Sequence, residues 1–169
     1  MESLIEWLPK TRPDDEGVAL VHGDYRIDNL IFYDASPELA AVVDWELSTI
    51  GDPAADFAKF LMAWVLPCSE RSGLGTVAVG GIPSFDDAID LYSSRTALDV
   101  RPNLPWYLAF NLFRHAAILQ GVKKRVLQGN ASSEAAQERA QKVPLFADLG
   151  WLIAQGSGST STHFHSSNE

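Results

Sequence analysis

The chain has 169 residues, 46% of them hydrophobic, which suffices to bury the core of one domain without disulfides. Its formal net charge of −9 argues against nucleic acid or an anionic membrane as partner, because both require clustered Lys and Arg. No apolar run approaches the ~20 residues that cross a bilayer and the start is acidic, so we expect a cytoplasmic protein, with an organelle as the alternative.

Short apolar runs near the N-terminus predict a helix followed by a few strands. The expected segments are a helix over 2–8 that ends at Pro9, a buried strand over 18–21, and two strands over 30–33 and 39–43. Turn-forming residues separate the last two strands and favour a hairpin. Such a hairpin would bring Asn29, before its first strand, close to Asp44, after its second.

The remainder is predicted to be helical. Asp52 as N-cap and Pro53 open one helix, on which Phe57, Phe60, Leu61 and Trp64 share a face. Later in the chain we expect a loop over 66–83, a helix from Ser84 to about Leu98 with Asp87 in a capping box, and the longest helix from Asn103 to Gly129. A last helix over 133–154, broken at Pro144, and a disordered tail over 156–169 follow.

Two short motifs carry the chemistry. The first is His22-Gly23-Asp24-Tyr25-Arg26-Ile27-Asp28-Asn29, and the second is Val42-Val43-Asp44-Trp45-Glu46. Phosphoryl transfer needs a carboxylate that accepts the proton of a hydroxyl, a second carboxylate that holds Mg²⁺, and an amide that completes the metal shell. The two motifs supply these groups in that order.

The pattern resembles the catalytic loop and metal-binding Asp of the protein-kinase-like fold, as used by the aminoglycoside phosphotransferase and choline kinase superfamily. The resemblance covers roughly residues 1–155. Residues 106–110 and 112–121 are similar to the phosphotransferase domain at the N-terminus of some acyl-CoA dehydrogenase proteins. The resemblance implies an α+β, mostly helical C-terminal lobe over 1–155, with a small β-hairpin that carries the catalytic loop and the metal site.

The same resemblance implies roles for individual residues, with Mg²⁺ and ATP as cofactors. Matched by position, the catalytic residues are Asp24 as base and Arg26 as a contact to the transferred phosphate; the cofactor-binding residues are His22, which supports the loop, and the metal ligands Asn29 and Asp44. Asp56 matches a residue that braces the loop, although a first-turn carboxylate favoured by the helix dipole explains it equally well.

Two departures shape the expected partners. Glu46 stands where protein kinases have a Gly, and residues 1–21 leave no room for a Gly-rich phosphate loop or a strand Lys. The sequence therefore resembles a C-terminal lobe alone, whose exposed apolar surface we expect to cause self-association. The implied acceptor is a small-molecule alcohol, either a hydroxyacyl-CoA or an aminoglycoside or choline-like compound. A non-catalytic binding module or a truncated product is the alternative.

Other polar residues leave two readings open. Arg114 and His115 interrupt an apolar helix and either face an acceptor cleft or pack and pair elsewhere. Gly73-Leu74-Gly75 is interpreted as an ordinary loop, and His163 with His165 as solvated tail residues.

Overall fold

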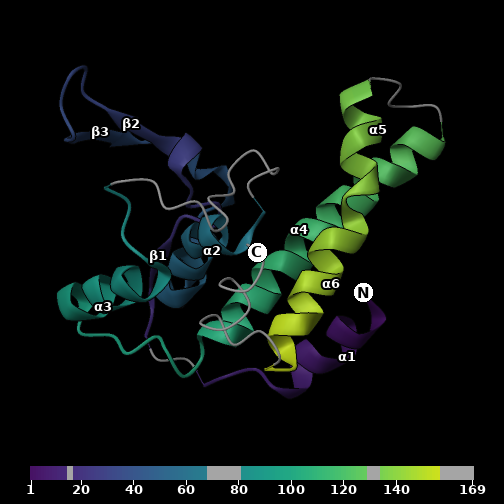
Figure 1. Cartoon of the computed structure of the whole chain (residues 1–169), viewed down its shortest axis with the longest axis horizontal. Coiled ribbons are helices and arrows are strands. Elements are labelled where there is room, and N and C mark those ends of the chain that lie inside the picture. The colour runs from purple at the N-terminus through teal and green to yellow at the C-terminus, as the bar shows by residue number, and fades with distance from the viewer. Residues whose placement is uncertain (15–16, 68–80, 129–133, 157–169) are drawn as a thin grey trace, which may run out of the picture. The chain divides into compact units, whose positions relative to one another are not determined.

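The computed structural model describes residues 1–14, 17–67, 81–128 and 134–156. The chain forms two compact units, one made of residues 14–107 and the other of residues 1–13 with 108–169 (Figure 1). The predicted tail, the Gly73-Leu74-Gly75 loop, Cys68 and the expected helix end at Gly129 lie outside the described residues. None of the described helices is long and apolar enough to span a bilayer.

The strands lie in the unit of residues 14–107. In the described part they are β1 (Ala19–Val21), β2 (Leu30–Phe32), β3 (Leu39–Val42) and β4 (Thr49–Gly51), with 3₁₀ turns at Ile27–Asn29 and Trp45–Leu47. β2 and β3 form the predicted antiparallel hairpin. β1 pairs antiparallel with β4, a strand that the sequence did not reveal because it is short and has no alternating pattern.

Two helices complete this unit. Helix α2 (Pro53–Val65) packs on β1 and begins as predicted, with the Asp52 side chain accepting a hydrogen bond from the N–H of Ala54 at 2.8 Å. Its buried face differs in part from the predicted one, since Phe60 and Trp64 are half-buried; the buried residues are Ala54, Phe57, Ala58, Leu61, Met62 and Val65. Helix α3 (Phe85–Thr96) has the predicted capping box of Ser84 and Asp87.

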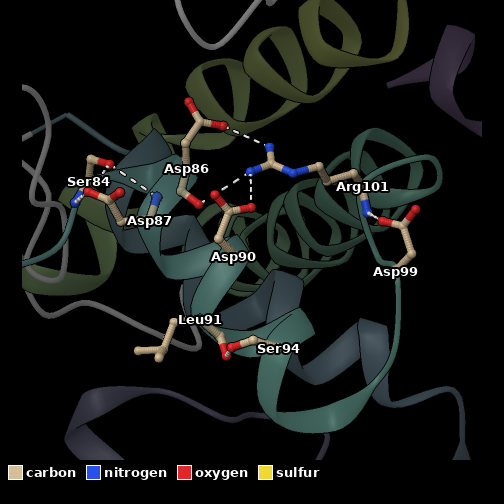
Figure 2. A network of polar contacts seen from close by, with 8 residues as sticks. All are labelled: Ser84, Asp86, Asp87, Asp90, Leu91, Ser94, Asp99 and Arg101. Atoms are coloured by element: carbon tan, nitrogen blue, oxygen red, sulfur yellow. Dashed lines mark hydrogen bonds and ion pairs between the residues drawn. The ribbon is translucent and has the colours of Figure 1, made fainter.

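An exposed ionic network ties the start of α3 to the loop that follows the helix (Figure 2). The Arg101 guanidinium lies 2.9 Å from the Asp86 carboxylate and 2.5 Å from that of Asp90. Hydrogen bonds to Asp86 and Asp90 raise the pKa of Arg101 above its usual value. The network neutralises the two carboxylates of α3 and joins the helix to the loop that follows it, which is a structural role.

The other unit is helical. It contains α1 (Glu2–Lys10), most of α4 (Leu104–Leu127), α5 (Glu134–Gln141) and α6 (Val143–Ala154), with α1 beside α6 (Figure 1). Pro9 lies inside α1, which ends one residue later rather than at the proline. The predicted last helix is two helices that part at Lys142, because Pro144 fits the first turn of α6. The ring centroids of His115 and Phe146 lie 4.3 Å apart, which favours a packing role for His115 over a place in an acceptor cleft.

Candidate active site

The loop between β1 and β2 is built around His22, whose side chain is only 2% exposed. Its Nε2 lies 2.8 Å from the carbonyl oxygen of Val43, and its Nδ1 accepts a hydrogen bond from the N–H of Asp24 at 3.2 Å. Because Nδ1 accepts, Nε2 carries the proton and donates to Val43. His22 thereby links the first motif to the second.

Asp24 is held on three sides. Its N–H donates to His22, and its carbonyl oxygen accepts a hydrogen bond from the Asn29 side-chain amide at 2.9 Å. Its carboxylate Oδ1 lies 3.2 Å from Nζ of Lys59. The backbone of the predicted base is therefore fixed, while its side chain remains 27% exposed and accessible to a ligand.

The hairpin brings the predicted metal ligands to the same end of two paired strands. The N–H of Val43 donates to the carbonyl oxygen of Asn29 at 3.0 Å, immediately before Asp44. Asp44 adopts the left-handed conformation with φ of 68°, which is uncommon for a residue with a side chain and is often found at functional sites. Asn29 thus precedes β2 and Asp44 follows β3, at the same end of two adjacent strands, as predicted.

These two residues fit a magnesium ion by the chemistry of their donors. The Asn29 amide nitrogen is used by the Asp24 carbonyl, which leaves the amide oxygen as the atom for a cation. Asp44 supplies an exposed carboxylate. Among the described residues no group of three or more His, Cys, Asp or Glu could form an all-protein metal site. Two oxygen donors suit Mg²⁺, which usually keeps waters and takes substrate phosphates.

Asp56 of α2 braces the loop from behind. Its carboxylate accepts hydrogen bonds from the backbone N–H groups of His22 and Gly23, the second at 2.9 Å. Gly23 has φ of +82°, and a Cβ atom there would lie 2.4 Å from the carbonyl oxygen of Leu47. Of the two readings of Asp56, the structure supports the brace. The loop accordingly requires both a glycine at 23 and an acceptor at 56.

Aromatic side chains pack behind α2. The rings of Phe57 and Tyr92 are stacked with centroids 3.9 Å apart, and the Tyr107 hydroxyl donates to the Asp52 carboxylate. Burial raises the pKa of Tyr92, and the nearby charges of Asp52 and Asp56 raise it further. The raised pKa disfavours the phenolate, and the stacking on Phe57 makes Tyr92 a packing residue.

The two cations of the loop region have different partners. Arg26, predicted to contact the transferred phosphate, is paired with Asp28. Lys59 is paired with Asp24 and was missed by sequence reasoning. Its position three residues after Asp56 puts both side chains on one face of α2, and this spacing is the sign that could have identified it.

Comparisons with known proteins identify the family of the chain. Residues 1–87 match the sequence model of the phosphotransferase enzyme family. The chain is 44% identical over 162 residues to acyl-CoA dehydrogenase family member 10 of Mus musculus, covering 94% of this chain and 15% of that protein. It is 39% identical over 176 residues to family member 11 of Gallus gallus, covering all of this chain and 23% of that protein.

A solved structure shares the fold. This is a Ralstonia eutropha protein, provisionally described as an aminoglycoside phosphotransferase, with a TM-score of 0.86 and 39% identity over 92% of this chain and 48% of that one. The chain spans less than half of that protein and under a quarter of the two acyl-CoA dehydrogenase relatives. The family match, the kinase-like α+β fold and the joined motifs lead to one conclusion: the chain belongs to the phosphotransferase enzyme family.

Proposed function

We propose that this chain is the C-terminal lobe of an ATP-dependent phosphotransferase that acts on a small-molecule hydroxyl. The lobe corresponds to residues 1–155 and works with a nucleotide-cradling half that these residues do not supply. The observation that carries the proposal is the pair of hydrogen bonds at Val43, one from His22 and one to Asn29, which join the two motifs.

The proposed reaction follows from the positions of the side chains. The Asp24 carboxylate orients the acceptor hydroxyl and takes its proton as the acceptor oxygen bonds to the terminal phosphorus of ATP; the bond to the ADP oxygen breaks and ADP leaves. Asn29 and Asp44 would hold Mg²⁺, which would neutralise charge on the nucleotide phosphates. His22 and Asp56 keep the loop in place throughout.

The names of the relatives favour one acceptor class. Two relatives that match 94% or more of this chain are named acyl-CoA dehydrogenase family members, and an acyl-CoA is a thioester. We therefore favour a hydroxyacyl-CoA as acceptor over an aminoglycoside or a choline-like alcohol.

The test uses the full-length gene product that carries this sequence, assayed for phosphate transfer from MgATP to a panel of hydroxyacyl-CoA thioesters, aminoglycosides and choline. Asp24→Asn should lower turnover by at least about a thousandfold, because the proton acceptor is lost, and should leave MgATP binding intact. Turnover retained by this variant would reject the role of Asp24.

A non-catalytic binding module remains the second candidate, because the chain matches only 48% of its structural relative. Calorimetric titration with MgATP and the transfer assay, both on the wild-type full-length protein, separate the two. Micromolar binding with turnover of an added alcohol would exclude the inert module, whereas a wild-type full-length protein without turnover of any acceptor would support it.

A further inference from the structure

Lys59 forms an ion pair with Asp24 and has no role in the reaction proposed above. Nζ of Lys59 lies 3.2 Å from Oδ1 of Asp24, and the lysine side chain is only 11% exposed. Desolvating a lysine ammonium is costly unless a partner and hydrogen bonds compensate. A nearly buried lysine beside the predicted base therefore differs from an ordinary surface ion pair.

The lysine is also placed by a rigid element. Helix α2 fixes the backbone of His22 and Gly23 through Asp56, and Lys59 extends from the next turn of the same helix to the carboxylate of Asp24. One helix thus positions both the backbone of the loop and the carboxylate of Asp24. Sites built on a helix hold their groups more accurately than sites on loops.

The geometry places this ammonium close to the reacting atoms. An acceptor hydroxyl bound by Asp24 would lie about 2.6–3.2 Å from its carboxylate. The phosphoryl group is transferred to the oxygen of this acceptor hydroxyl. The other oxygens of the phosphoryl group therefore come within reach of a cation that already contacts Asp24. A lysine ammonium has three N–H donors and can contact a carboxylate and a phosphoryl oxygen together. Arg26, the other cation of the loop, is paired with Asp28.

We propose that Lys59 is a further catalytic residue, which holds the Asp24 side chain in the free protein and contacts the transferred phosphoryl group during the reaction. The proposal rests on the proposed function. It assigns to helix α2 the phosphate-contacting charge that sequence reasoning gave to Arg26. The step adds no proton transfer, because Lys59 stays an ammonium and the hydroxyl proton still passes to Asp24.

The test measures binding by calorimetry in the full-length gene product. MgADP alone is compared with MgADP plus aluminium fluoride, which imitates the transferring phosphoryl group. Lys59→Met and Lys59→Gln should lose the preference for the aluminium fluoride complex by roughly tenfold or more, because the cation that faces the phosphoryl group is gone, while MgADP binds as in the wild type. Lys59→Arg should recover most of the preference. Lys10→Met, on an exposed lysine of α1, is the matched control and should change neither affinity.

The outcomes distinguish the two proposals. A folded neutral variant that keeps the full preference would overturn the role of Lys59, as would equal weakening of both complexes, which is what a purely structural brace predicts. If the wild type binds neither complex, the proposed function itself fails and this inference fails with it. Thermal unfolding of each variant identifies those that are folded.

Discussion

At the residue scale, the site depends on a few positions where the residue type is fixed by its surroundings. Gly23 is the clearest, because it combines a positive φ with a carbonyl oxygen only 2.4 Å from any added Cβ. Other glycines in the described residues lack such a neighbour, and Gly121 in α4 has no atom within 4 Å of an added Cβ. Glycine at 23 is therefore required by the shape of the loop.

Gly23→Ala should destabilise the protein by about 3 kcal/mol, through backbone strain and the clash with Leu47. Gly121→Ala is the matched control and should be neutral or stabilising by up to about 1 kcal/mol, because alanine favours the helix. Urea unfolding of the two variants measures both free energies. Equal stability of the two variants would show that the loop does not need glycine.

At the element scale, helix α2 organises the site. Asp52 caps the helix and Pro53 begins its first turn. The Asp56 carboxylate accepts hydrogen bonds from the loop, and the apolar face of the helix packs into the core. The sequence predicted the helix start because caps act locally. It left the use of the Asp56 carboxylate open between a brace for the loop and a first-turn charge, since His22 is 34 residues from Asp56 along the chain.

Asp56→Ala should cost about 2–4 kcal/mol, because the N–H groups of His22 and Gly23 lose a charged acceptor in a part-buried place. Asp56→Asn keeps one acceptor oxygen and should cost less. Chemical denaturation gives the free energies, and Asp148→Ala, on an exposed carboxylate of α6, serves as control. A loss no greater than that of the control would contradict the brace.

The whole molecule exposes much apolar surface in the unit of residues 14–107. Leu20 of β1 and Ile50 of β4 are register partners and are 63% and 66% exposed. The hairpin adds the exposed residues Ile31, Phe32 and Leu39. Apolar surface on this scale usually marks an interaction site or a tendency to aggregate.

The isolated 169-residue chain should therefore self-associate with rising concentration. Replacing Leu20 and Ile50 together by Thr should shift it toward monomer, because threonine keeps the strand preference and removes apolar area. Leu127→Thr changes an exposed leucine of α4 and should have no such effect. Analytical ultracentrifugation measures all three proteins, and a monomeric wild type would contradict the prediction.

The sequence by itself determined the motifs, the hairpin, the helix caps and the family, because these depend on residue order and on spacings of a few positions. Only the tertiary structure decided the pairing of β1 with β4, the double hydrogen bond to Asp56 and the contact of Lys59 with Asp24. Such contacts join segments far apart in the chain, and their geometry depends on how the helix packs against the strand. The spacing of Asp56 and Lys59 puts both side chains on one face of α2, but only the packing of that helix brings Lys59 to Asp24.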